Sequence, residues 1–283
     1  MPRFDIDDLE QRDSALVQVW IDRLGPVLDA CFHPVVQGLD RVPEGAAMYV
    51  GNHSGGMLTP DSFVLFRALA DEVGLSALPY GLGHEVMLST WPFNNLIVPL
   101  GAVRACRENG LALLSRGRKI MIYPGGEAEV FRAHSRRNKV DFRGRRGYAR
   151  LAIEGGVPII PVASAGGHSS LLIVSQGRRL AKAIGAPRHL RMHSWPLTLS
   201  VPWGVTLGPV PPHIPIPTRI HVEVLEPVQL SRVGVEAAAD EAYVTEVDAV
   251  VRDRIQTALT RLAGERRDVS RRHRVLRSLR ERF

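Results

Sequence analysis

The sequence predicts a single α/β domain in which a central, largely parallel mixed sheet is flanked by helices. Short apolar runs closed by glycine or proline recur along the chain, which is the pattern of buried strands. Segments with helical spacing of apolar residues lie between these runs. Because parallel strands need a long crossover, usually a helix, the alternation indicates a largely parallel sheet. With 283 residues, 45% of them hydrophobic, the chain has enough material for one large core.

Four apolar runs are predicted to be buried strands, and a later run is predicted to be a half-exposed strand. The buried strands are expected at 46–51, 97–101, 119–123 and 157–162. Residues 219–225 alternate polar and apolar side chains, as a strand with one face in water does. Helices are expected at 14–32, from Asp61 onwards, at 109–115, at 147–153 and at 237–262.

The chain is predicted to divide into an N-terminal amphipathic helical segment (1–38), the folded domain (39–265) and a basic C-terminal tail (266–283). In the first part, Gly25-Pro26 is expected to kink or break the helix, because proline removes a backbone donor. Packing of this amphipathic helix on the domain is favoured over anchoring in a membrane.

Positive charge is concentrated in the tail. The formal net charge is +7, and residues 266–283 hold eight arginines against two acidic residues. Val275, Leu276 and Leu279 accompany them, a mixture that suits an anionic membrane surface better than a nucleic-acid groove. The basic clusters lack an aromatic stacking pattern, so no nucleic-acid partner is expected. Contact with anionic membrane lipids and a solvated tail both remain open.

Composition argues against a secreted or metal-dependent protein. Cys31 and Cys106 are the only cysteines, which form neither a disulfide framework nor a metal site. The first residues are acidic, and the apolar core of a signal peptide does not follow them. We therefore expect no metal and no bound cofactor, and a cytoplasmic protein associated peripherally with the inner face of the cell membrane.

One long segment has no charged side chain. Residues 193–218 contain no Asp, Glu, Lys or Arg, but they contain seven prolines. Because each proline lacks a backbone donor and fixes its backbone angle, an ordinary membrane-spanning helix is excluded. Two interpretations stay open: a buried strand with an irregular loop beside the sheet, or a hydrophobic loop that dips into the bilayer near a substrate entrance.

The strongest candidate for chemistry is the glycine-rich loop after the first buried strand. It contains Asn52, His53, Gly55 and Gly56, and Asp61 follows at the start of a helix. Acyl transfer to an alcohol needs a base for the hydroxyl proton and donors for the developing oxyanion. A histidine on a strand-to-helix loop, with a carboxylate nearby, meets the first need. His53 and Asp61 are therefore the predicted catalytic residues; the alternative is a structural histidine.

A second glycine turn follows the strand at 119–123. It reads Tyr-Pro-Gly-Gly-Glu-Ala-Glu-Val-Phe-Arg from Tyr123 to Arg132. Carboxyl ends of parallel strands meet at one edge of a sheet, so this turn should lie beside His53. Its backbone N–H groups suit an anion or oxyanion, and its charged side chains suit acceptor hydroxyls. An ordinary turn with surface charges is the alternative.

Four blocks, in order, resemble the glycerophospholipid acyltransferase superfamily. They are Asn52-His53-Ser-Gly-Gly with Asp61, then Gly101-Ala-Val-Arg104-Ala-Cys-Arg107, then Tyr-Pro-Gly-Gly-Glu127, then Val157-Pro-Ile-Ile-Pro. The chain most resembles the subgroup that includes type-two diacylglycerol and monoacylglycerol acyltransferases. The resemblance covers most of the chain and implies a glycerol-3-phosphate acyltransferase-like fold.

The resemblance also implies residue roles. His53 would be the general base and Asp61 its charge-relay partner. The donor would be acyl-CoA or acyl carrier protein, and the acyl group would pass directly to the acceptor with no acyl-enzyme. The predicted substrate-binding residues are Asn52, Arg104, Arg107, Gly125, Gly126, Glu127, Glu129 and Arg132.

Two features depart from the family pattern. The family's acid lies five residues after the histidine, whereas position 58 here is Leu and Asp61 lies eight residues after His53. A longer loop that folds Asp61 back is favoured, with Glu127 or Glu129 as substitutes. The family's Pro-Glu-Gly-Thr-Arg block is replaced by Pro-Gly-Gly-Glu, which makes a neutral lipid alcohol as good a candidate acceptor as a phosphate-bearing one.

The predicted function is transfer of a fatty acyl chain from an acyl thioester to a hydroxyl of a lysophospholipid or neutral glycerolipid. A lipid ester hydrolase is one alternative, since Ser54 follows His53, although the chain lacks a Gly-x-Ser-x-Gly elbow. A non-catalytic protein that binds membrane lipids through the arginine tail is the other.

Overall fold

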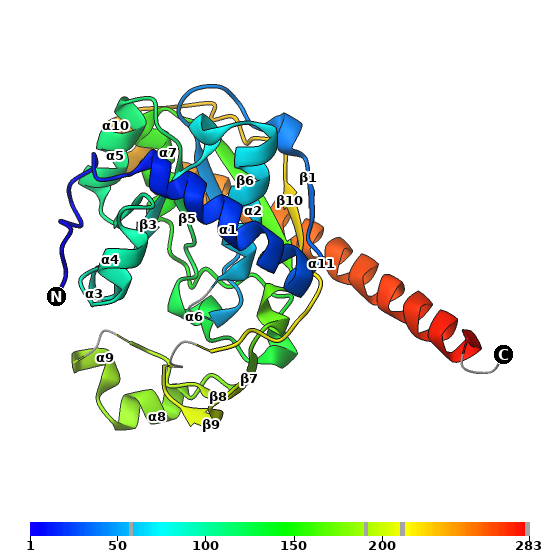
Figure 1. Cartoon of the computed structure of the whole chain (residues 1–283). Helices are drawn as coiled ribbons and strands as arrows, with labels where there is room; N and C mark the ends of the chain where they lie inside the picture. Colours follow the sequence, from blue (N-terminus) through cyan, green and yellow to red (C-terminus); the bar gives the residue numbers. More distant parts are fainter. Residues whose placement is uncertain (57–58, 190–191, 210–212, 281–283) are drawn as a thin grey trace.

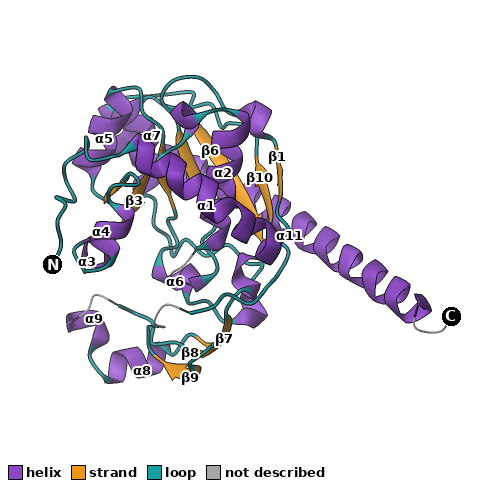
Figure 2. Ribbon diagram, viewed as in Figure 1, coloured by secondary structure: helices purple, strands orange, loops and turns teal. Residues whose placement is uncertain are grey.

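The computed structural model describes residues 1–56, 59–189, 192–209 and 213–280, with side chains through residue 267. Its main body is a seven-stranded sheet between two layers of helices (Figures 1 and 2). The strand order is β1-β10-β6-β2-β5-β3-β4, and every pairing is parallel except that between β10 and β6. The predicted α/β class with a central, largely parallel mixed sheet is therefore confirmed.

The strands of the large sheet are β1 Val35–Gln37, β2 Met48–Gly51, β3 Tyr80–Gly83, β4 Ala102–Arg104, β5 Ile120–Ile122, β6 Ile159–Ala165 and β10 His221–Val224. A second, three-stranded sheet contains β7 Leu172–Ser175, β8 Leu197–Ser200 and β9 Gly204–Leu207. The main helices are α1 Ser14–Phe32, α2 Pro60–Glu72, α5 Arg107–Ser115, α7 Gly147–Gly155, α10 Val235–Ala239 and α11 Glu241–Arg280. Shorter helices are α3 Glu85–Leu88, α4 Phe93–Ile97, α6 Glu127–Val130, α8 Arg178–Ala183 and α9 Ala186–His189.

The two helical layers follow from alternation along the strands. On β2, Met48 and Val50 point into a core shared with α5, α7, α10 and α11. Tyr49 points the other way, into a core shared with α1 and α2. Successive side chains of a strand face opposite sides, so a strand buried on both faces must be apolar throughout. This is why residues 46–51 read as one continuous apolar run.

The residues at the starts of α1 and α2 explain why each helix begins where it does. Asp13 caps α1 by accepting hydrogen bonds from the backbone N–H groups of Ala15 and Leu16. Pro60 occupies the first turn of α2, where a backbone N–H would have no partner. The helix over 14–32 is confirmed, and Pro26 lies within it rather than ending it.

Two sequence-based assignments, the strand at 97–101 and the helix at 237–262, are wrong in detail. Residues 97–101 are not a strand: α4 ends at Ile97, a turn follows, and strand pairing begins at Ala102. A short apolar run fits a buried turn as well as a strand, so periodicity could not separate the two. The helix over 237–262 is divided at Asp240 into α10 and α11, and α11 extends to Arg280.

The strand expected to be half exposed is buried on both faces. β10 lies between β1 and β6, and its polar residues His221 and Glu223 are 7% exposed. Glu223 is accommodated there because Arg41 and Arg261 both pair with it. The polar positions of the alternation therefore lie inside the protein and do not mark a solvent face.

The described residues of the proline-rich segment, 193–209 and 213–218, belong to a small lobe with β7, β8, β9, α8 and α9, which lies on the α6 side of the molecule (Figure 1). The predicted tail begins at Arg266, whose guanidinium donates to the Arg219 carbonyl and to the Thr218 hydroxyl. Its side chains from residue 268 onward lie outside the described part. Among the described helices, none is both long and apolar enough to cross a membrane.

We predict that Ile255→Ala in α11 lowers the free energy of unfolding by about 2–5 kcal/mol. Ile255 is fully buried in the core between α11 and the sheet, so its truncation leaves a cavity. Val250→Ala on the same helix is the control; this residue is 37% exposed, and we expect a change of about 0.5 kcal/mol or less. Urea denaturation measures both, and equal losses would contradict the packing described.

Candidate active site

Three neighbouring strands of the sheet end beside one another and bring the predicted site together. β2 lies between β5 and β6, with Val50 opposite Ile122 and Gly51 opposite Val162. The segments that leave these strands start at Asn52, Tyr123 and Gly166. Because all three strands are parallel, the segments emerge at the same carboxyl edge, where α/β sheets bind ligands.

Asn52 joins two of these segments. Its side-chain amide donates to the Ser164 carbonyl, and its side-chain oxygen accepts from the Ser164 N–H, both at 2.9 Å. The side chain is almost fully buried. Asn52 thus continues the β2–β6 ladder by one more pair of hydrogen bonds and fixes the start of the His53 loop.

The His53 ring stacks on Tyr123, with the ring centroids 4.3 Å apart and the planes inclined by 19°. Tyr123 is held in turn by a 2.6 Å hydrogen bond between its hydroxyl and that of Ser62. Desolvation, together with the charge of Arg132, lowers the pKa of His53 to about 3. The imidazole is therefore neutral at physiological pH, the state in which it can accept a proton.

The buried ion pair of Glu129 and Arg132 supports the His53 loop. Glu129 is fully buried, and one of its oxygens accepts from the His53 backbone N–H at 2.9 Å. The other oxygen accepts from the Asp141 N–H at 2.8 Å and from Arg132 at 3.2 Å. Burial raises the pKa of Glu129, and the Arg132 charge opposes this effect. Both side chains contact protein groups, which indicates that they position the loop.

Glycine is required at position 125, where the Glu129 side chain packs against the turn that follows β5. A Cβ at Gly125 would lie 2.2 Å from Cγ of Glu129, and a Cβ at Gly51 would lie 2.9 Å from the Tyr123 ring. Gly126 adopts φ of 50°, in the left-handed region that favours glycine. The Gly125-Gly126 pair thus lets α6 fold back under the loop.

Asp61 is buried at the start of α2 and accepts a 2.6 Å hydrogen bond from the Ser54 hydroxyl. Gly167, after β6, packs against this pair, since a Cβ there would lie 2.5 Å from the Ser54 oxygen. Burial raises the pKa of Asp61 to about 6, although the hydroxyls of Ser54 and Ser164 act in the opposite direction. Asp61 therefore changes charge just below neutral pH.

Within the described residues, no hydrogen bond joins Asp61 to His53. Nδ1 of His53 is buried without a hydrogen-bond partner there, and the second carboxylate oxygen of Asp61 makes no hydrogen bond of normal geometry. The two groups leave the same loop, in which Gly55 and Gly56 both have positive φ. Nδ1 of His53 and one carboxylate oxygen of Asp61 thus lie close in sequence, and each is free to form a further hydrogen bond.

The remaining predicted residues occupy the periphery. Glu127 accepts a 2.6 Å hydrogen bond from the His193 N–H, which ties the small lobe to the glycine turn. Arg104 is paired with Asp7 at 2.7 Å, and Arg107 is paired with Glu154. In the described part of the chain, neither arginine forms a hydrogen bond or ion pair with His53.

Comparison with known proteins gives a match to one family. The family model described as "Acyltransferase" matches residues 33–165, the segment that contains the His53 loop and the glycine turn. This segment of the chain is therefore similar to acyltransferases.

The relatives found by sequence are distant. The chain is 25% identical to the uncharacterized protein Rv0502 of Mycobacterium tuberculosis over 239 residues, which is 84% of this chain and 64% of that protein. It is 27% identical over 127 residues to a mouse protein named DGAT1/2-independent enzyme synthesizing storage lipids, which is 45% of this chain and 37% of that one. The chain thus spans less than two thirds of the length of these curated relatives.

Among solved structures, the chain is similar to the 1-acyl-sn-glycerophosphate (LPA) acyltransferase PlsC from Thermotoga maritima. The TM-score is 0.48 and the sequence identity 16%, with 86% of this chain and 78% of that chain covered.

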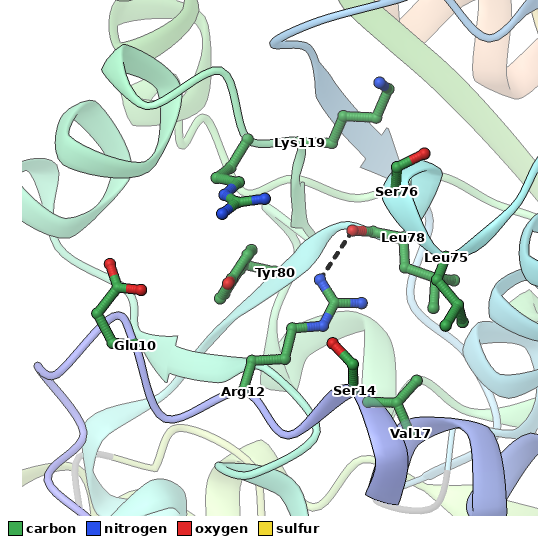
Figure 3. A pocket seen from close by; sticks show the side chains of 10 residues that line it. Glu10, Arg12, Ser14, Val17, Leu75, Ser76, Leu78, Tyr80 and Lys119 are labelled. Carbon is green, nitrogen blue, oxygen red and sulfur yellow. Dashed lines mark hydrogen bonds between the residues drawn. The ribbon is translucent and has the colours of Figure 1, made fainter.

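A surface pocket elsewhere on the chain is not part of the site. It is lined by Arg12, Tyr80 and Lys119, among others, and Arg12 donates to the Leu78 carbonyl at 3.0 Å (Figure 3). Tyr80 begins β3 and Lys119 precedes β5, so the pocket lies at the amino edge of the sheet. Its lining includes no histidine. Elsewhere in the described part of the chain, no cluster of His, Cys, Asp and Glu could hold a metal ion.

Sequence reasoning missed several residues that shape this candidate site. Ser54 was weighed only as a nucleophile, yet it holds Asp61. Tyr123 directly follows β5 and packs on His53. Gly167 follows β6, the third strand to end at this edge. The carboxyl-edge rule that linked the first two segments would also have pointed to the third.

We predict that Glu129→Gln lowers the free energy of unfolding by about 3–5 kcal/mol, because the Arg132 charge stays buried without a counter-charge. The control is Glu10→Gln, which breaks an exposed pair with Arg116 and should change stability by about 1 kcal/mol or less. Urea denaturation measures both. If Glu129→Gln combined with Arg132→Met is no more stable than Glu129→Gln alone, the buried charge is not the cause.

We predict that Asp61→Asn is more stable than the wild type at pH 8 by roughly 1–3 kcal/mol. The folded-state pKa of Asp61 is raised to about 6 from a usual value near 3.8, so the wild type must ionise a buried acid as the pH rises. That cost develops between about pH 4 and 6 and is complete above this range. Melting temperatures at pH 4 and pH 8 test this. A difference that is equal at both pH values would show that ionisation is not involved.

Proposed function

We propose that this chain is an O-acyltransferase that moves a fatty acyl group from an acyl thioester to a hydroxyl of a lipid acceptor. The observation that carries the proposal is the neutral His53 imidazole at the carboxyl edge of the sheet, with the buried carboxylate of Asp61 in the same loop. The match of residues 33–165 to the acyltransferase family model supports this chemistry.

In the proposed reaction, His53 removes the proton from the acceptor hydroxyl while its oxygen attacks the thioester carbonyl carbon. A new ester C–O bond forms, the C–S bond breaks, and the thiolate leaves with the proton carried by the imidazole. Backbone N–H groups of the glycine turns are the candidate donors for the transient oxyanion. Direct transfer needs no covalent acyl-enzyme.

Asp61 has a specific task in this scheme. A histidine whose pKa lies near 3 is a weak base, because its surroundings disfavour the imidazolium. A nearby carboxylate stabilises that cation and makes proton abstraction easier. We propose that Asp61 turns from Ser54 to Nδ1 of His53 when substrate binds, by a change in the glycine-containing loop between them.

The hydrolase alternative is less well supported. A serine nucleophile needs its proton accepted by a neighbouring base. The Ser54 hydroxyl instead donates to Asp61, and the side chain is 2% exposed. Ser54 is better explained as a holder of the acid than as a nucleophile.

The finer details extend the same proposal. The donor is acyl-CoA or acyl carrier protein, and the acceptor is a lysophospholipid or a neutral glycerolipid. Gly125, Gly126 and Glu127 border the acceptor site. Arg104 and Arg107 line it only if they exchange their present partners, Asp7 and Glu154, for substrate. The protein associates peripherally with an anionic membrane at the inner face of the cell membrane, and its basic tail contributes to this.

We predict that His53→Ala lowers the rate of acyl transfer by about 100-fold or more. Purified protein would be offered labelled acyl-CoA, or acyl carrier protein, with lysolipids, diacylglycerol and long-chain alcohols. His189→Ala, at an exposed position on α9, is the matched control and should retain full activity.

Three outcomes decide the matter. Labelled ester that disappears with His53→Ala supports the proposal. Free fatty acid as the sole product would favour a hydrolase. Neither product, from a protein that still binds membranes, would favour a non-catalytic lipid-binding protein.

A further inference from the structure

The small lobe contains a hairpin whose polarity is reversed. On β8, Thr198 and Ser200 point inward and are 0% and 7% exposed, whereas Leu199 between them is 39% exposed. On β9, Val205 and Leu207 are 71% and 60% exposed. A strand on a water-soluble protein usually turns its apolar residues inward and its polar residues outward. This hairpin does the opposite.

The inward polar face is partly paired internally, because the buried Ser200 hydroxyl has no hydrogen-bond partner among the described residues. The outward face is continuous. The hydroxyls of Thr198 and Thr206 bond to each other across β8 and β9. Outside, the apolar surface includes the turn residue Trp203, and it extends to Ile214, which pairs with Val201 beside the hairpin. We call this surface the apolar hairpin; its members are Leu199, Val201, Trp203, Val205, Leu207 and Ile214.

Positive charge accompanies the apolar hairpin, and negative charge is missing from its surroundings in sequence. Residues 155–222 contain no aspartate or glutamate. The exposed cations of the lobe lie on α8 and α9, at Arg178, Arg179, Lys182 and Arg188. In space, Arg178 lies 4.0 Å from the carboxylate of Asp141, which is outside the lobe. Apolar side chains with an excess of nearby cations match a surface of anionic headgroups above hydrocarbon.

We propose that the apolar hairpin is the surface by which this protein docks onto an anionic lipid bilayer. Its outward Val, Leu and Ile side chains enter the boundary between headgroups and acyl chains, and Trp203 lies at the headgroup level that tryptophan prefers. Arg178, Arg179 and Lys182 contact the anionic headgroups. Insertion is shallow, because the edge strands keep backbone groups that need water or another partner.

The lobe is attached to the candidate active site. The His193 N–H donates to Glu127, and the Gln176 side chain donates to the Ala128 carbonyl at 3.0 Å. Both acceptors belong to α6, directly after the Gly125-Gly126 turn. In Figure 1 the lobe lies on the α6 side of the large sheet. Docking through the apolar hairpin would therefore hold the His53 edge toward the membrane that contains lipid acceptors.

The test is sedimentation of the full chain with phosphatidylcholine vesicles, with and without phosphatidylglycerol. No acyl donor or acceptor is added, so the result is independent of the proposed catalysis. Val205→Glu combined with Leu207→Glu should weaken partition onto the mixed vesicles by about tenfold or more, because two apolar insertions are lost and two like charges are added. Both positions are exposed, so the fold should survive, which thermal denaturation checks.

The matched control is Val235→Glu, an apolar residue on α10 that is 68% exposed. It should bind like the wild type. Replacing Arg178, Arg179 and Lys182 with glutamine should remove the preference for vesicles containing phosphatidylglycerol. Vesicles should also shift wild-type tryptophan emission to the blue, and Trp203→Phe should lose that shift.

Several results would overturn the proposal. These are no binding of the wild type to either vesicle, equal binding by the double glutamate variant, or an equal loss in Val235→Glu. A wild-type dimer in light scattering that the glutamate pair converts to monomer would assign the apolar hairpin to a second copy of the chain instead.

Discussion

The buried pair of Glu129 and Arg132 is the interaction on which the site depends. Glu129 reaches the backbone of His53 on one side and that of Asp141 on the other. Its position requires Gly125, because any side chain there would occupy the space of the carboxylate. A charge buried this completely is tolerated only with a counter-charge and with hydrogen bonds to both of its oxygens. The loop geometry, the glycine turn and the ion pair are thus one arrangement.

Much of the large sheet could be predicted because its strands are buried on both faces. Runs such as 46–51 and 157–162 have no polar positions to confuse with loops, and glycine or proline bounds them. The carboxyl-edge rule then brought the His53 loop and the glycine turn after residues 119–123 together without further information. The rule depends only on strand direction, which the alternation of helices and strands gives.

Other features could not be predicted because they depend on spatial partners. Glu129 looks like a surface residue in sequence, and only the fold provides Arg132 and two backbone donors for it. The alternating pattern of β10 predicted a water-facing side, but Arg261 on α11 and Arg41 neutralise its acid instead. On β8 the pattern of alternation was readable, yet nothing in it says which face is inward.

The position of β10 has a consequence for how this protein can be divided. β10 follows the family-matched segment by more than fifty residues, yet it lies between β1 and β6, which both belong to that segment. A fragment cut at the limits of the matched segment would leave β1 with no neighbour in the sheet and would remove α11 from the core. The matched segment, which contains the His53 loop and the glycine turn, therefore cannot be moved into another protein by itself. Recombination or domain engineering would have to carry the C-terminal third along with them.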